Sequence, residues 1–80
     1  MAEEVGRGKH DPLPYQLALR RLGVAPDEAL AFEDSPSGVR SAVGAWIPTY
    51  GLLTWHKGEA LLQAGAKGVF RDFREALGLL

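Results

Sequence analysis

The sequence contains no cysteine, which excludes disulfide bonds, zinc sites built on thiolates and a cysteine nucleophile. It has no apolar run approaching the roughly 18 residues that a membrane-spanning helix needs, so we expect no membrane partner. A basic excess is also absent. Nine Lys and Arg against ten Asp and Glu give a net charge of −1, which argues against nucleic-acid binding. The acidic first four residues lack the hydrophobic core of a signal peptide, so we expect a cytoplasmic protein.

What remains is the composition of an ordinary globular domain. The 80 residues, 46% hydrophobic and 24% charged, are enough for one domain, 1–80, and too few for two. A domain of this size buries only about 60–65% of the surface that its unfolded chain exposes. Its margin of stability is therefore small, and an unpaired apolar sheet edge would favour association with a partner.

Helical and strand-like segments alternate along the chain. Asp11 and Pro12 are typical of a helix start, and Gly23 is typical of a helix end. The apolar run at 29–32 has no polar alternation, which is typical of a strand buried on both faces of a parallel sheet. This order predicts an α/β fold with about three parallel strands and four helices. The patterns place the helices at 12–22, 36–45, 56–64 and 72–79, and the strands at 29–32, 47–53 and 69–70.

Two carboxylates come directly after the strand predicted at 29–32. Glu33 and Asp34 precede Ser35, a candidate N-cap, and Pro36, which suits the first position of a helix. Open parallel sheets bind ligands at the C-terminal ends of their strands. Carboxylates in this place could hold Mg²⁺, and the helix N-terminus could attract a phosphate. The alternative is a solvated turn in which Asp34 and Ser35 only cap the helix.

Several other side chains allow both a functional and a structural interpretation. Lys9 could neutralise a phosphate as a point charge, or be a solvated surface lysine. We interpret His10 as an exposed loop residue and Tyr15 as a half-buried packing residue. Trp46 and Trp55 both follow predicted element ends. They either form an aromatic contact surface or cover the ends of the small core.

Taken together, these segments resemble the C-terminal half of the Rossmann-like, three-layer core of the haloacid dehalogenase (HAD) superfamily. The closest likeness is to its phosphatase and β-phosphoglucomutase-like branch. The resemblance covers residues 6–78. It rests on Gly-Lys-His-Asp-Pro at 8–12, like the family's Gly-Lys-Pro-x-Pro loop, and on Phe-Glu-Asp-Ser-Pro-Ser-Gly at 32–38, like its acidic motif.

The resemblance implies a role for four side chains and a class of substrate. Lys9 matches the lysine that stabilises the transferring phosphoryl group, and Ser35 is expected beside it on the phosphate. Glu33 and Asp34 match the acidic pair that helps to hold Mg²⁺. The implied substrate is a phosphorylated small molecule.

The sequence departs from the family mainly in what it omits. No Asp-x-Asp occurs, so the nucleophilic aspartate of the family is missing, as are its Ser/Thr phosphate-binding motif and its cap domain. We therefore expect a truncated phosphohydrolase core that is inactive alone. His10 stands where the family usually has proline, and Trp55 stands near a usual glycine. Trp46 stands where a glycine usually closes the second helix, and if it must take a positive φ there, the turn is strained or re-formed.

The missing half has a structural consequence. Without the nucleophile strand, the strand at 29–32 would be an apolar sheet edge, and such edges recruit other chains. We therefore expect a homo-oligomer. Two further functions remain open. One is a non-catalytic self-associating module that uses Trp46, Trp55 and this edge. The other is a Mg²⁺-dependent phosphatase that is active only with a complementary chain supplying the Asp-x-Asp half.

Overall fold

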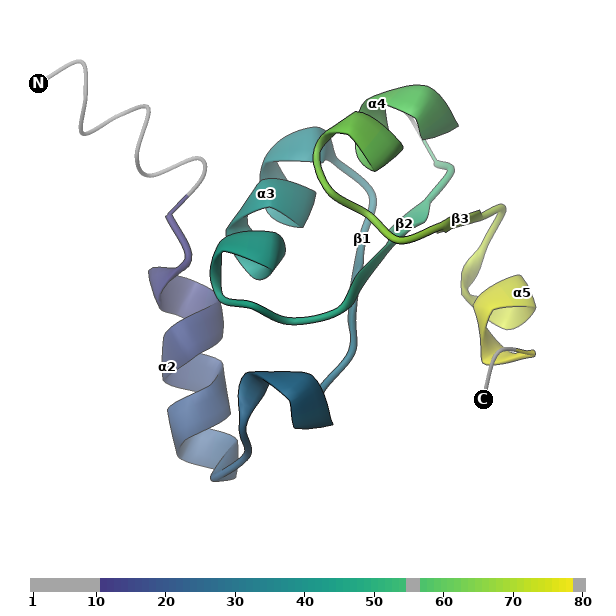
Figure 1. Ribbon diagram of the computed structural model, residues 1–80. Helices are drawn as coiled ribbons and strands as arrows, with labels where there is room; N and C mark the ends of the chain where they lie inside the picture. The colour runs from purple at the N-terminus through teal and green to yellow at the C-terminus, as the bar shows by residue number, and fades with distance from the viewer. Residues whose placement is uncertain (1–10, 55–56, 79–80) are drawn as a thin grey trace, which may run out of the picture.

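The computed structural model describes residues 11–54 and 57–78. Its centre is a parallel sheet of three strands in the order β1-β2-β3, made of β1 (Ala31–Glu33), β2 (Thr49–Leu52) and β3 (Val69–Phe70). A helix connects each strand to the next, as Figure 1 shows. The α/β fold with parallel strands predicted from the sequence is therefore confirmed.

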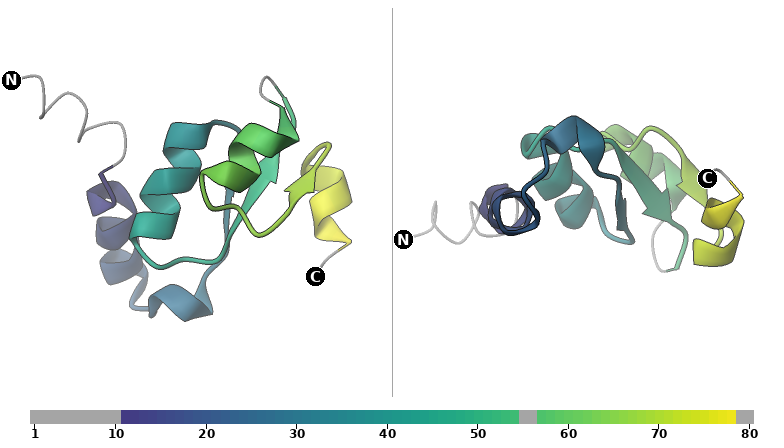
Figure 2. Two further views of the ribbon diagram at one scale, coloured as in Figure 1. Left: turned by 45° about the horizontal axis from the view of Figure 1, so that its top comes forward. Right: turned by 90° about the horizontal axis from the view of Figure 1, so that it is seen from below.

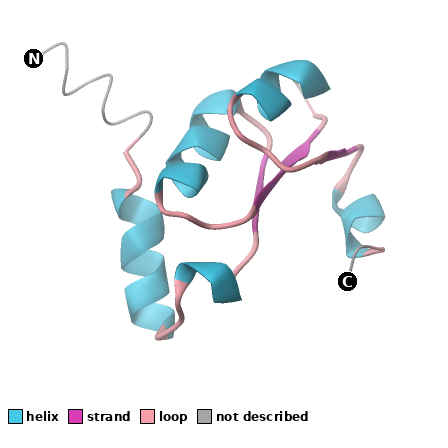
Figure 3. Ribbon diagram, in the orientation of Figure 1, coloured by secondary structure: helices cyan, strands magenta, loops and turns pink. Residues whose placement is uncertain are grey.

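The described residues form four α-helices and one short 3₁₀ turn. They are α2 (Leu13–Leu22), η1 (Pro26–Glu28), α3 (Pro36–Gly44), α4 (Gly58–Gln63) and α5 (Phe73–Leu77). In this part of the chain, no helix is long and apolar enough to cross a lipid bilayer. Helices α3 and α4 pack on the sheet, whereas α2 packs on α3, as Figure 3 shows by element type. Figure 2 shows α2 and α5 at opposite ends of the molecule.

The buried core consists of small and aliphatic side chains between the sheet and the helices. One cluster joins α2, α3 and β1 through Leu19, Ala31, Ala42, Ala45 and Ile47. A second cluster joins α3 and α4 through Val39, Leu61, Ala64 and Ala66. Both clusters depend on α3, which is therefore the central helix of the fold.

The other face of the sheet carries a row of aromatic side chains, one from each strand. Tyr50 lies between Phe32, with ring centroids 6.0 Å apart, and Phe70, with centroids 5.6 Å apart. Phe73 of α5 contacts Phe32 edge-on at 5.3 Å, so α5 reaches this second face. The row is only half-buried at the three strand positions, and Phe73 is 51% exposed.

Strand β1 differs from its predicted range in a way that matters for the site. It begins at Ala31 rather than at residue 29, because the amide of Ala29 bonds to the carbonyl of Pro26 at 3.2 Å in the η1 turn. It extends to Glu33, which lies opposite Gly51 in the ladder. Glu33 is thus the last residue of the strand and not the first residue after it.

Helix α3 ends in a turn that places a residue other than glycine in a left-handed conformation. The amide of Trp46 bonds to the carbonyl of Val43 at 2.8 Å, and the amide of Ile47 bonds to the carbonyl of Ala42 at 3.2 Å. These two bonds define a Schellman motif, whose left-handed position is most often glycine. Here the left-handed position is taken by Trp46, with φ 67°. The indole of Trp46 is 83% exposed. The turn includes Ile47, so β2 begins at Thr49, two residues later than predicted.

The remaining element ends follow from capping. The prediction of Asp11 as N-cap and Pro12 as first helical residue is off by one position, because α2 begins at Leu13 with Pro12 as its N-cap. Asp11 lies one residue before the N-cap and accepts a hydrogen bond from the amide of Leu13 at 2.9 Å. Gly23 closes α2 with φ 69°, as predicted. Asp72 caps α5 by accepting from the amide of Glu75 at 2.8 Å. Helices α4 and α5 are shorter than the ranges 56–64 and 72–79 predicted for them.

Candidate functional site

The acidic motif lies at the C-terminal end of β1, where the chain turns into α3. Glu33 ends the strand, Asp34 follows, and Ser35 is the N-cap of α3 with Pro36 at its first position. The Ser35 hydroxyl accepts a hydrogen bond from the amide of Gly38 at 3.1 Å. The predicted cap is therefore present, and the positive end of α3 faces the same edge of the sheet as the two carboxylates.

Glu33 is held between two helices. The hydroxyl of Tyr15, which projects from α2, donates a hydrogen bond to Oε2 of Glu33. On the other side, a Cβ placed on Gly38 of α3 would lie 2.1 Å from Oε1, so the carboxylate occupies space that only glycine leaves open. From the sequence, Tyr15 was interpreted as a packing residue, and its contact with Glu33 was not predicted because an 18-residue separation carries no local signal.

The two carboxylates affect each other electrostatically. Partial burial, and to a smaller extent the charge of the neighbouring Asp34, raise the pKa of Glu33 above its ordinary value. Both causes disfavour the ionised carboxylate. A cation bound at this edge would act in the opposite direction, because it stabilises both negative charges.

Asp34 has a partner from the next strand. The hydroxyl of Thr54, two residues after the end of β2, donates to Oδ2 of Asp34 at 3.1 Å. The C-terminal ends of two parallel strands thus contribute to one site. Thr54 was not predicted from the sequence, although its position just after the strand next to β1 is a signal that could have identified it.

The side chains present at this edge fit a hard divalent cation. Glu33, Asp34 and Thr54 offer only oxygen atoms, which Mg²⁺ prefers. Within residues 11–54 and 57–78, no three or more His, Cys, Asp or Glu side chains come together as a metal-binding group. The described residues thus supply two carboxylates at most, which is the number that Mg²⁺ often takes from a protein beside water and phosphate.

The other site residues predicted from the sequence do not lie in this cluster. Lys9 and Trp55 fall outside the described residues. Trp46 is described, and it lies at the C-terminal end of α3, the end remote from Ser35.

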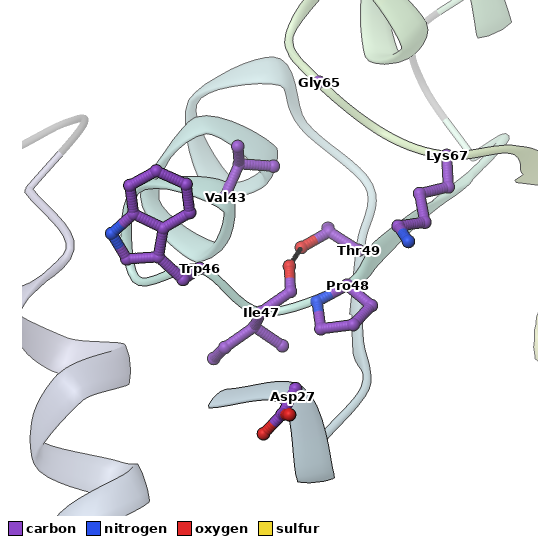
Figure 4. A pocket seen from close by; sticks show the side chains of 8 residues that line it. All are labelled: Asp27, Val43, Trp46, Ile47, Pro48, Thr49, Gly65 and Lys67. Carbon is purple, nitrogen blue, oxygen red and sulfur yellow. Dashed lines mark hydrogen bonds between the residues drawn. The ribbon is translucent and has the colours of Figure 1, made fainter. Parts of the chain in front are cut away.

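A hollow of about 220 Å³ opens at the opposite end of the strands from the acidic motif. Pro48 and Thr49 start β2 there, and Lys67 precedes β3. Figure 4 shows Trp46 and Lys67 on opposite sides of this hollow, with Asp27 below. It contains neither Glu33 nor Asp34, so it is distinct from the candidate metal site.

Comparison with known proteins bears on this geometry. Residues 1–45 match the family described as haloacid dehalogenase-like hydrolase. The chain belongs to this family. Residues 1–45 include both the lysine loop and the acidic motif, so the resemblance stated from the sequence is confirmed.

Individual HAD-like proteins are similar to this chain in sequence, and one solved structure is similar to it in fold. The chain is 47% identical to a phosphorylated carbohydrates phosphatase of Thermotoga maritima, over 98% of this chain and 37% of that protein. It is 46% identical to a validoxylamine A 7′-phosphate phosphatase of Streptomyces hygroscopicus, over 79% of this chain and 30% of that protein. A solved structure of a candidate β-phosphoglucomutase from Thermotoga maritima superposes with a TM-score of 0.78 and 42% identity, over 86% of this chain and 32% of that one. The chain thus spans about a third of the length of these HAD-like relatives.

Proposed function

We propose that this chain contributes the acidic half of a Mg²⁺-dependent HAD-like phosphohydrolase site that acts on a phosphorylated small molecule. The main support is the position of Glu33 and Asp34 at the C-terminal end of β1, with Thr54 reaching them from the end of β2. Two relatives favour this class of substrate, since one is named as a phosphorylated carbohydrates phosphatase and the other as a validoxylamine A 7′-phosphate phosphatase. We also propose that the protein works in the cytoplasm.

Each residue of the site has a distinct role in this proposal. Glu33 and Asp34 would hold Mg²⁺, which offsets the charge on the phosphoryl oxygens when it is bound. Lys9 would contact the same oxygens from the other side as a point charge. Ser35 would lie beside the phosphate while its hydroxyl caps α3, whose first amides also point toward an anion.

These 80 residues do not supply the nucleophile of the proposed reaction. No Asp-x-Asp occurs within residues 1–80, so this stretch is a partial core domain without the family's nucleophile strand and cap. A chain of these 80 residues is therefore inactive alone, because covalent phosphoryl transfer needs that aspartate. Any active form would receive its nucleophile from outside residues 1–80, for example from a complementary chain.

A second candidate function, self-association, is favoured by a separate observation. Among the described residues β1 pairs only with β2, so its other edge presents backbone donors and acceptors. The half-buried aromatic row formed by Phe32, Tyr50 and Phe70 adds an apolar face next to that edge. We propose a homo-oligomer that covers this edge, with Trp46 and Trp55 as further contact residues.

A single set of measurements tests both functions. The purified 80-residue chain is assayed with p-nitrophenyl phosphate and Mg²⁺, titrated with Mn²⁺ by calorimetry, and sedimented across a range of concentrations. We expect no turnover, Mn²⁺ binding that Asp34→Ala abolishes, and an oligomer. Turnover that depends on Asp34 would contradict the inactive state. A monodisperse monomer would rule out self-association, and equal Mn²⁺ binding by Asp34→Ala would rule out the metal site.

A further inference from the structure

Tyr15 connects the outermost helix to the acidic site. It projects from α2, which packs mainly on α3, and its ring packs against the core cluster that contains Leu19 and Ala31. Its hydroxyl nevertheless reaches Oε2 of Glu33 at the end of β1. Tyrosine often packs its ring against apolar residues while its hydroxyl reaches a polar partner, but here the partner is one of the two carboxylates assigned to the metal.

The surroundings of Glu33 leave its carboxylate little freedom. Tyr15 donates to one oxygen, while the backbone of Gly38 lies close to the other, since a Cβ there would lie 2.1 Å from Oε1. A carboxylate has about four lone-pair positions. One hydrogen bond from a phenol fixes the rotation of the group and still leaves positions on both oxygens for a cation.

We infer that Tyr15 is a positioning residue for the cation site, in that its hydroxyl sets the orientation in which Glu33 meets a divalent metal ion. The inference rests on the proposed function, since it assumes that Glu33 is a metal ligand. Groups that orient a metal ligand by a hydrogen bond typically change metal affinity by about 10- to 100-fold when they are removed.

The chain offers a matched control. Tyr50 is the only other tyrosine, and it lies in the aromatic row on the opposite face of the sheet, between Phe32 and Phe70. Tyr15→Phe and Tyr50→Phe remove the same single oxygen atom from half-buried rings. Only the first removes the hydrogen bond to Glu33.

The experiment measures Mn²⁺ affinity of the full 80-residue chain by calorimetry, with circular dichroism melts to verify folding. We expect Tyr15→Phe to weaken Mn²⁺ binding by about 10-fold or more, and Tyr50→Phe to change it by less than about twofold. Equal affinities of Tyr15→Phe and the unmodified chain would overturn the inference and leave the proposed metal site intact. Absence of Mn²⁺ binding by the unmodified chain would overturn both.

A double-mutant cycle distinguishes positioning from a general structural role. If Tyr15 acts through Glu33, then Tyr15→Phe has no further effect on Mn²⁺ affinity once Glu33→Ala has removed the carboxylate. The same four variants are also compared by melting temperature without metal, which measures the contribution of the hydrogen bond to stability. We expect the effects of the two substitutions on melting temperature to be non-additive as well. Additive effects in both cycles would show that the two residues act independently, and they would overturn the inference.

Discussion

The hydroxyl of Thr54 donates a hydrogen bond to Oδ2 of Asp34 at 3.1 Å, and this contact joins the C-terminal ends of β1 and β2. Thr54 is exposed, so the bond itself adds little to stability. We expect the hydrogen bond to act mainly by fixing the orientation of the Asp34 carboxylate. Thr54→Val should weaken Mn²⁺ binding by about tenfold, with melting temperature nearly unchanged. Thr54→Ser keeps the hydroxyl and should bind as the unmodified chain does, and equal loss in both variants would contradict this role.

Gly38 determines the space available to Glu33. An added methyl group at Gly38 would lie 2.1 Å from Oε1, so Gly38→Ala must displace the carboxylate. Alanine is favoured over glycine in a helix by about 1 kcal/mol, which offsets the loss of the hydrogen bond from Tyr15. We therefore expect similar stability in urea but at least tenfold weaker Mn²⁺ binding.

The control for this substitution removes the clash. In a Glu33→Ala background, Gly38→Ala has no carboxylate to displace and should stabilise the chain by about 1 kcal/mol. Ser37→Ala, one position earlier in α3, should leave Mn²⁺ binding unchanged. A destabilising effect of Gly38→Ala in the Glu33→Ala background would contradict the assigned contact.

Trp46 carries conformational strain at the end of α3. A left-handed backbone costs a residue with a Cβ about 1–2 kcal/mol, and glycine avoids this cost. The indole is 83% exposed, so its removal loses little packing. After allowance for the greater freedom of glycine in the unfolded state, Trp46→Gly should stabilise the chain by about 0.5–1 kcal/mol. That corresponds to a rise of roughly 2–8 °C in melting temperature.

The neighbouring residue supplies the control. Ala45 has φ −90° and is buried, so glycine there relieves no strain. Ala45→Gly should destabilise the chain by about 1 kcal/mol. If Trp46→Gly also lowers the melting temperature, the tryptophan contributes packing that outweighs its strain, which would be expected if it lies in an interface between copies.

The stability of the chain should depend on pH through Glu75 of α5. Hydrogen bonds from the backbone and side chain of Arg71, followed by its charge, lower the pKa of Glu75 below its ordinary value. The folded state therefore favours ionised Glu75. Its contribution to stability is complete above the unfolded pKa and is lost as pH falls through the lowered folded value.

Glu75→Gln isolates this contribution. The difference in melting temperature between the unmodified chain and Glu75→Gln should be largest near neutral pH and vanish in acid. Because the pair is exposed, the difference should also shrink in high salt. A difference that is constant across pH would mean that the carboxylate charge plays no part.

Local patterns in the sequence were sufficient for the order of elements. The apolar run before Glu33 and the glycine stop at Gly23 each act within a few residues, and each is present in the structure. The exact ends of the strands were less predictable, because Ala29 and Ile47 are apolar enough for a strand but are held by turn hydrogen bonds.

Contacts that determine the site geometry could not be predicted in the same way. Glu33 and Asp34 were predicted from a motif, but their partners Tyr15 and Thr54 lie 18 and 20 residues away from them. Such contacts depend on how α2 packs on α3 and on the register of β1 with β2. The usual glycine of the family at the position of Trp46 indicated that a positive φ could be required there, and the structure has one. Lys9 lies outside the described residues.

The register of the sheet has a consequence for how the chain folds. Both ladders join residues separated by 18 positions, Ala31 with Thr49 and Gly51 with Val69, and no two strands meet through a hairpin. Neither pair of strands can form from residues close in sequence, because the chain must first return through a helical crossover connection. Among the described strands, no pairing is therefore possible before both β1 and β2 are present, and α3, whose side chains enter both core clusters, connects them.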